Sequence, residues 1–209
     1  MQRPLRHRAA LFLSAGVRPL LSASHCGPDL AACRTVASVA AIEHVGAKAV
    51  FVDVKDDHLM DEEKIEELIT EKTKAIMPVH LEGKMCNMLK ISEIAKKHKL
   101  LLIEDAAQAF GSKFDGEYPG KRSDVACFSF HPLKNLNALG DGGLVISKHR
   151  EVLERIARLR NHGQVTRNSS IEYGFVSRLN SFQAASVKIR LKNISKIIKN
   201  KKIIINKTQ

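Results

Sequence analysis

Residues 75–105 read AIMPVHLEGKMCNMLKISEIAKKHKLLLIED, and this stretch decides the fold class. The apolar runs at 75–79 and 100–105 are short and continuous, which is typical of strands buried on both faces of a sheet. Between them, residues 88–99 repeat apolar side chains at helical spacing. A strand, a helix and a second strand in this order predict parallel strands in an α/β domain.

The same alternation extends outward in both directions. Apolar runs predict further strands at 49–54, 125–130 and 144–147, and apolar periodicity predicts further helices at 61–70 and 150–160. Asp61 is placed to cap the helix at 61–70, with Ile65 on its apolar face. We therefore expect an α/β fold with a mainly parallel sheet and helices on both faces.

Composition and charge narrow the class of protein. A chain of 209 residues with 44% hydrophobic and 27% charged residues indicates a soluble, globular protein, and no apolar run reaches the roughly 18 residues of a spanning helix. The net charge of +12 lies at the two ends, because residues 35–187 contain 21 basic and 21 acidic side chains. We therefore expect neither a nucleic-acid nor a membrane partner.

The four cysteines carry no sign of a disulfide framework or a metal site. Cys26, Cys33, Cys86 and Cys127 form no CxxC pair and show no metal-ligand spacing. Reduced thiols are typical of the cytoplasm, which is the localisation we expect.

The chain divides into three segments of different character. Residues 1–35 are rich in Arg, Ala, Leu and Ser, which suits either an organellar transit peptide or an unrelated, mis-started leader. Residues 36–187 hold the α/β alternation. Residues 188–209 are rich in Lys, Ile and Asn and contain no acid, as expected of a solvated, truncated end.

Asp105 and Lys134 are the candidates for chemistry, because ligands of α/β sheets bind at the carboxyl ends of the strands. A carboxylate can hold a protonated pyridine nitrogen, and an amine in a partly apolar pocket can attack an aldehyde, which together suit pyridoxal phosphate. Simpler interpretations stay open. Asp105 could cap a helix, Lys134 could be a surface residue, and residues 140–143 (GDGG) could form a chain reversal with positive φ angles.

Several motifs occur in an order that identifies a family. VFVDV, PVHLEG, IEDAAQAFGS, CFSFHPLKNLNALGDGG, LRNHGQ and SRLNSFQAA together resemble the DegT/DnrJ/EryC1/StrS family of pyridoxal-phosphate-dependent sugar aminotransferases. The resemblance covers about residues 36–191. It implies the large domain of the aspartate aminotransferase fold (fold type I), here incomplete.

The resemblance also implies roles for individual residues. Lys134 is similar to the lysine that bonds covalently to pyridoxal 5'-phosphate and moves the proton during catalysis. Asp105 is similar to the aspartate that pairs with the pyridinium nitrogen, and Gln108 to the glutamine beside the phenolic oxygen. Ser129 is similar to the serine that binds the cofactor phosphate, and His131 belongs to the same motif.

The reaction implied by the family transfers an amino group, typically from glutamate, to a keto group on a nucleotide-linked deoxysugar. Such products feed polysaccharide and related sugar biosynthesis. Family members are usually homodimers, and no metal is implied.

The chain also departs from the family pattern. Residues 1–35 lack the Gly-Thr loop that binds the cofactor phosphate at a helix N-terminus, and Thr35 replaces the aromatic residue that stacks on the ring. Val176 stands where the family has an asparagine, and we expect a truncated chain without the family's smaller C-terminal domain. Two alternatives therefore stand beside the enzyme: an inactive fragment of one, and a basic-tailed protein that binds anions.

Overall fold

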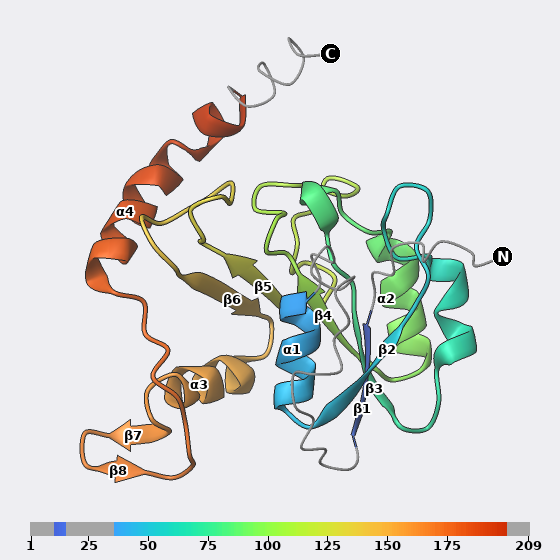
Figure 1. Ribbon diagram of the computed structural model, residues 1–209, viewed down its shortest axis with the longest axis horizontal. Helices are drawn as coiled ribbons and strands as arrows, with labels where there is room; N and C mark the ends of the chain where they lie inside the picture. The colour runs from blue at the N-terminus through green and yellow to red at the C-terminus, as the bar shows by residue number, and fades with distance from the viewer. Residues whose placement is uncertain (1–10, 16–35, 200–209) are drawn as a thin grey trace, which may run out of the picture. The chain divides into compact units, whose positions relative to one another are not determined.

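The computed structural model describes residues 11–15 and 36–199 (Figure 1). The chain forms two compact units, Met1–Ser123 and Asp124–Gln209. The boundary lies just before the strand that precedes Lys134, so the predicted site residues divide between the two units.

The described sheet of the first unit has the order β2-β1-β3-β4. Its strands are β1 (Leu11–Ala15), β2 (Ala47–Phe51), β3 (Thr73–Met77) and β4 (Leu101–Asp105). β3 and β4 are parallel, whereas β1 is antiparallel to both β2 and β3. Therefore β2, β3 and β4 all run in one direction, and the expected parallel arrangement is confirmed with β1 as the exception.

Strand β1 comes from the leader 1–35, for which the sequence predicts no element. Its backbone lies between two strands, with Leu11 opposite Phe51 of β2 on one side and Met77 of β3 on the other. An interior position satisfies hydrogen-bonding groups of the backbone on both edges of a strand. The other residues of the leader lie outside the described part of the chain.

Two helices accompany this sheet. Helix α1 (Val36–His44) packs against β2, and helix α2 (Met88–Lys97) packs against β4 (Figure 1). The structure confirms the predicted helix at 88–99 as α2, which follows the segment 78–87 after β3.

Both ends of α2 are closed by local hydrogen bonds. The side chain of Asn87 caps the start by accepting from the N–H of Lys90 at 3.3 Å. At the other end, the Leu100 N–H donates to the carbonyl of Ala95 at 2.8 Å and the Lys99 N–H donates to Lys96 at 3.1 Å. These two bonds form a Schellman motif. Lys99 adopts the left-handed conformation (φ 55°) at a position that is usually occupied by glycine.

The segment 61–70 corrects a prediction. It forms two separate 3-10 turns, Glu62–Lys64 and Glu66–Leu68, and not a continuous α-helix. Asp61 does cap the first turn by accepting from the Glu63 N–H at 3.1 Å. β-branched residues such as Ile65 and Ile69 favour helix weakly, and the chain becomes extended at Ile69.

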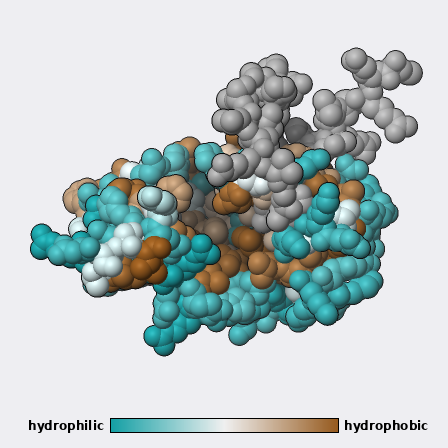
Figure 2. Space-filling model, turned by 90° about the horizontal axis from the view of Figure 1, so that it is seen from below, coloured by the Kyte–Doolittle hydropathy of each residue, from teal (hydrophilic) through white to brown (hydrophobic). Residues whose placement is uncertain are grey.

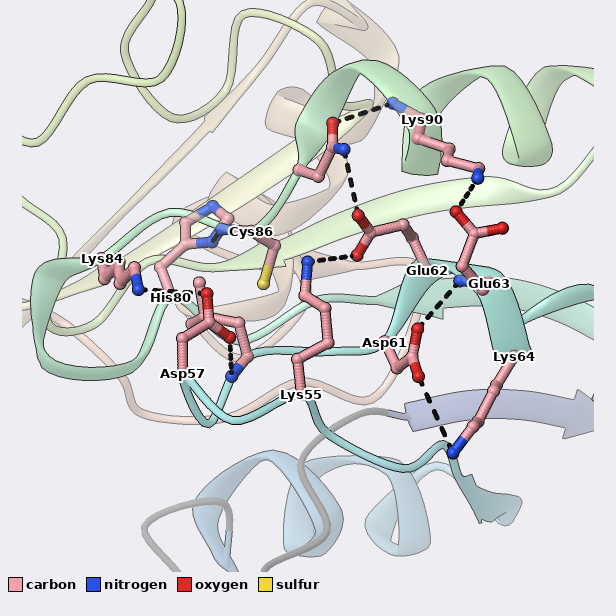
Figure 3. Close-up of polar contacts among 12 residues, drawn as sticks. Lys55, Asp57, Asp61, Glu62, Glu63, Lys64, His80, Lys84, Cys86 and Lys90 are labelled. Carbon is pink, nitrogen blue, oxygen red and sulfur yellow. Dashed lines mark hydrogen bonds and ion pairs between the residues drawn. The ribbon is translucent and has the colours of Figure 1, made fainter.

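Glu62 gives a second reason for this correction, because its side chain is buried in the first unit and bonded to two other segments. Its carboxylate accepts from the Lys55 Nζ at 2.7 Å and from the Asn87 Nδ2 at 3.0 Å (Figure 3). Burial alone would raise the pKa of Glu62, but these hydrogen bonds and the charge of Lys55 outweigh it and lower that pKa. The first 3-10 turn is thereby tied to the start of α2.

The apolar core of the first unit gathers around these elements. It contains side chains from β3, β4, α2 and the segments between the strands and α2: Val52, Leu59, Met60, Ile65, Ile76, Met85, Cys86, Met88, Ile91, Ile94, Ala95 and Leu102. The predicted strands and α2 supply most of it. The apolar runs that decide the fold class therefore also build its core.

The second unit contains antiparallel strand pairs and helices. Its elements are β5 (Val125–Ser129), β6 (Gly143–Ser147), α3 (Arg150–Leu159), β7 (Gln164–Thr166), β8 (Ser169–Ser170) and α4 (Ser181–Lys192). β5 and β6 pair antiparallel, with Ser129 opposite Gly143. The predicted strands at 125–130 and 144–147 and the helix at 150–160 are confirmed.

Apolar surface is exposed in both units, and Figure 2 shows hydrophobic patches breaking a largely hydrophilic surface on the face that it draws. In the second unit, Tyr173, Phe175 and Phe182 are among the exposed large side chains. Within residues 11–15 and 36–199, no helix is long and apolar enough to cross a membrane.

Candidate functional site

Asp105 ends strand β4, as the sequence predicts. Its backbone N–H donates to the carbonyl of Pro78 at 2.9 Å, and its own carbonyl accepts from the N–H of His80 at 3.0 Å. These bonds continue the parallel pairing beyond β3, because Val79 and Asp105 form a parallel bridge. The main chain of Asp105 is therefore fixed on its β3 side.

The carboxylate of Asp105 is held at both oxygens. Its Oδ1 accepts from the Ala107 N–H at 3.1 Å, and its Oδ2 accepts from the hydroxyl of Ser38 in α1. The residues that follow form turns, such as the one closed by the Ala109 N–H and the Ala106 carbonyl. Asp105 therefore does not cap a helix, which removes the simpler interpretation of its position.

Gln108 lies three residues after Asp105. A hydrogen bond fixes the orientation of its side-chain amide. Its Oε1 accepts from the backbone N–H of Glu82 at 2.7 Å. The NH2 group is then the donor end of the side chain. Glu82 and Gly83 both have left-handed backbones, at φ 56° and 83°, so a strained turn presents this N–H to Gln108.

A buried polar pair lies behind the strand end, where the sequence predicts none. His80 and Glu104 are both excluded from solvent and bonded to one another. His80 Nδ1 accepts from the Cys86 N–H at 3.3 Å, so its Nε2 carries the proton that is donated to Glu104. The second oxygen of Glu104 accepts from the Gly120 N–H at 2.8 Å.

Cys86 belongs to the same buried group (Figure 3). Burial raises the pKa of its thiol to about 12, and its Sγ donates to the carbonyl of Val79 at 3.3 Å. A thiol in this state is a poor nucleophile. Within the described part of the chain, Cys86 and Cys127 form no disulfide, and Cys26 and Cys33 lie outside it.

The second unit holds the other predicted site residues in one turn after β5. Ser129 ends the strand, and its Oγ accepts from the His131 N–H at 3.2 Å. His131 is exposed, with its Nδ1 accepting from the Leu133 N–H at 3.2 Å. The Lys134 N–H donates to the His131 carbonyl at 2.8 Å, so Lys134 closes this turn.

The turn that carries Lys134 is anchored at both sides. Phe130, Leu136 and Ala138 are buried, and the Ala138 N–H donates to the Phe130 carbonyl at 2.7 Å. The Asn137 amide donates to the Pro132 carbonyl at 2.8 Å. Lys134 itself is half-buried, so it is not the fully exposed surface residue of the simpler interpretation.

The glycines of residues 140–143 serve close packing and not a left-handed turn, which corrects the chain-reversal interpretation. None of them has a positive φ angle. A Cβ at Gly142 would lie 2.7 Å from the Leu179 Cδ1, and a Cβ at Gly140 would lie 3.1 Å from the Gln183 Nε2. The Leu139 N–H donates to the Gln183 Oε1 at 2.8 Å.

A hollow of about 730 Å³ also lies in the second unit. It is lined by parts of β5, β6, α3 and residues 176–179. None of the predicted site residues lines it. The hollow is therefore separate from the turn that carries Lys134.

The two groups of side chains fit the chemistry of pyridoxal phosphate. Each oxygen of the Asp105 carboxylate keeps a second lone pair for a pyridinium N–H, and the Gln108 NH2 group is a donor for a phenolic oxygen. Ser129 Oγ accepts from the His131 N–H, and among the described residues its hydroxyl proton has no acceptor, so it is available to a phosphate oxygen. Among the described residues, no cluster of His, Cys, Asp and Glu could hold a metal ion.

Sequence reasoning missed Ser38, the Glu82 backbone and the His80–Glu104 pair. Ser38 lies 67 positions from Asp105, and no local pattern predicts that contact. Of the two residues that replace family residues, Thr35 lies outside the described part of the chain, and Val176 is exposed and bridges to Asn161.

A family model described as the DegT/DnrJ/EryC1/StrS aminotransferase family matches residues 30–208. Among curated proteins, dTDP-3-amino-3,4,6-trideoxy-alpha-D-glucose transaminase of Micromonospora megalomicea subsp. nigra is 40% identical over 173 residues. That match covers 80% of this chain and 45% of the relative.

Solved structures agree with this match. DesV of S. venezuelae, solved in complex with a ketimine intermediate, is 41% identical with a TM-score of 0.75, over 77% of this chain and 44% of that one. The putative sugar aminotransferase Spr1654 of Streptococcus pneumoniae, in its PLP form, is 27% identical with a TM-score of 0.76, over 81% of this chain and 49% of that one. The chain thus spans less than half the length of each of these proteins.

Proposed function

Because this chain belongs to the DegT/DnrJ/EryC1/StrS aminotransferase family, we propose that it holds pyridoxal phosphate and takes part in amino transfer to a nucleotide-linked keto sugar. The observation that carries the proposal is the Asp105 carboxylate at the carboxyl end of β4, which is held at both oxygens and is followed three residues later by the oriented amide of Gln108. Bound pyridoxal phosphate supplies a protonated ring that accepts electrons from an amino acid carbon.

We propose a separate role for each of the five predicted site residues. Asp105 keeps the ring nitrogen protonated by offering a fixed negative charge, and Gln108 donates to the phenolic oxygen. Ser129 donates to the phosphate, with His131 supporting it through the turn. Lys134 would supply the amine that holds the cofactor, and its Nζ would be the group that accepts and returns a proton at the site.

The proposed substrates follow from the named relatives. The Micromonospora relative is a dTDP-amino-sugar transaminase, which favours a nucleotide-linked keto sugar as the acceptor. Glutamate is the proposed amino donor. Its amino group would replace the keto oxygen of the sugar, and 2-oxoglutarate would be released. We further propose that the product enters polysaccharide or related sugar biosynthesis in the cytoplasm.

A homodimer is the proposed assembly. Large apolar side chains such as Tyr173, Phe175 and Phe182 are exposed in the second unit, and surfaces of this kind commonly mark protein contacts. Sedimentation of the purified chain tests this part of the proposal, and a monomer at all concentrations would contradict it.

Turnover tests the proposed activity. The full chain, pyridoxal phosphate, glutamate and a dTDP-linked keto sugar are incubated, and the amino sugar is detected by mass spectrometry. We expect product with the wild-type chain and with Lys121→Ala, which changes an exposed lysine, but none with Lys134→Ala. Equal product from Lys134→Ala would overturn the assignment. An absence of product throughout would favour the inactive fragment.

A further inference from the structure

Ser38 joins two elements that are far apart in the chain. It lies in the first turn of α1, it is only 6% exposed, and its hydroxyl donates to the Oδ2 of Asp105 at the end of β4. A hydrogen bond from a buried hydroxyl to a carboxylate is stronger than one between neutral groups. The contact therefore holds α1 and β4 together at the carboxylate itself.

Ser38 controls a degree of freedom of Asp105 that the backbone does not. The bonds to Pro78 and His80 fix the main chain of Asp105, but the torsion that turns a carboxylate is broad and roughly two-fold. Two donors act on that torsion, the Ala107 N–H on Oδ1 and the Ser38 hydroxyl on Oδ2. Without Ser38, the Ala107 N–H would be the one donor among the described residues that sets the plane of the carboxylate.

The helix adds to this effect. The first turn of α1 contains no acidic residue. The N-terminus of a helix carries a partial positive charge, which stabilises a negative charge near it. The hydrogen bond to Ser38 places the Asp105 carboxylate of β4 near this end of α1.

We propose that Ser38 is a positioning residue, which orients the Asp105 carboxylate through its hydroxyl. On the proposed function, that orientation aims one lone pair of Asp105 at the pyridinium N–H. Ser38 itself would touch neither cofactor nor substrate. The orientation of the carboxylate is a property of the chain alone and can be measured without any ligand.

Ala107 provides the readout, since its N–H donates to the same carboxylate. The amide resonance and the hydrogen-exchange rate of Ala107 are measured by NMR in the full chain, in the wild type and in Ser38→Ala, Ser38→Thr and Ser92→Ala. Ser92 is the matched control, because it is a buried helical serine whose hydroxyl donates to the Leu89 carbonyl of its own helix.

Ser38→Ala is expected to move the Ala107 resonance and to speed its exchange about tenfold, the effect of losing one charge-assisted hydrogen bond. Ser38→Thr, which keeps the hydroxyl, should restore both, and Ser92→Ala should change neither. An unchanged Ala107 in Ser38→Ala, or an equal change in Ser92→Ala, would overturn the proposal.

Cofactor titration of the same four proteins separates this inference from the proposed function. We expect Ser38→Ala to weaken the binding of pyridoxal phosphate about tenfold relative to the wild type and Ser38→Thr. If no variant bound the cofactor, the proposed function would fail, and the Ala107 readout would still decide the role of Ser38. If all bound it equally while Ala107 moved, the positioning of Asp105 for the ring would be refuted.

Discussion

The Nε2 of His80 lies 2.7 Å from the Oε2 of Glu104, and both side chains are shut off from solvent. Glu104 directly precedes Asp105, and the His80 N–H donates to the carbonyl of Asp105. The pair therefore supports the strand end from its buried side.

Removing His80 should destabilise the first unit strongly. Among the described residues, His80→Leu would leave the buried Glu104 carboxylate with the Gly120 N–H as its remaining donor, and a buried acceptor that loses its partner typically costs about 1–3 kcal/mol, or more when it is charged. Denaturant unfolding of the full chain measures this loss. The control is His98→Leu, which breaks the corresponding contact between His98 and Glu66 at the surface and should change the midpoint little. Similar losses in both variants would contradict the account.

Glu62 should make stability depend on pH in the acid range. Its pKa is lowered in the folded chain, so its contribution is present above the ordinary glutamate value of 4.5 and is lost as the pH falls through the folded pKa. Glu62→Gln should therefore be less stable than the wild type at pH 7. The gap in melting temperature should close as the pH falls below 4.5.

Glu67→Gln is the control for this pH series, because Glu67 is exposed in the same segment. It should follow the wild-type curve. A gap between wild type and Glu62→Gln that stayed constant down to acid pH would show that the charge of Glu62 does not contribute.

Lys99 offers a stabilising change. It holds the left-handed position of the Schellman motif after α2, where glycine has no steric penalty. Lys99→Gly should raise the free energy of unfolding by about 1 kcal/mol. Lys96→Gly, inside the last turn of the same helix, should lower it by about 1 kcal/mol. Loss of stability in both variants would refute the motif.

Gly83 should tolerate alanine less well than Gly46. Both have positive φ angles, so Ala strains the backbone at either position. A Cβ at Gly46 meets nothing within 4 Å, whereas a Cβ at Gly83 would lie 3.1 Å from the Gln108 carbonyl oxygen. Gly83→Ala should therefore cost about 1 kcal/mol more in unfolding experiments. Equal costs would mean that the turn at Leu81–Gly83 does not press on Gln108.

Much of the fold could be predicted from local pattern. The apolar runs around β3, β4, β5 and β6 and the periodicity of α2 and α3 are short-range signals, and the structure confirms each element. The helix expected at 61–70 was wrong because burial of Glu62, a tertiary effect, fixed a tighter turn. The position of β1 was not predicted, because pairing with β2 and β3 has no local signal.

The residues of the candidate site could be predicted from the sequence, but their hydrogen-bond partners could not. Asp105 and Lys134 follow from strand ends and chemistry, and Gln108, Ser129 and His131 from the resemblance to the family. Their hydrogen-bond partners did not follow, because Ser38 and Glu82 are distant in the chain from the residues that they orient. The roles of these five residues with a cofactor stay predictions.

The most direct test of the central claim is borohydride reduction of the full chain with pyridoxal phosphate, followed by peptide mapping. Reduction converts the link between amine and aldehyde into a stable secondary amine, so the labelled lysine can be identified. We predict label on Lys134, kept in Lys121→Ala and lost in Lys134→Ala. Label scattered over exposed lysines, or no label, would contradict the claim that this chain holds the cofactor through Lys134.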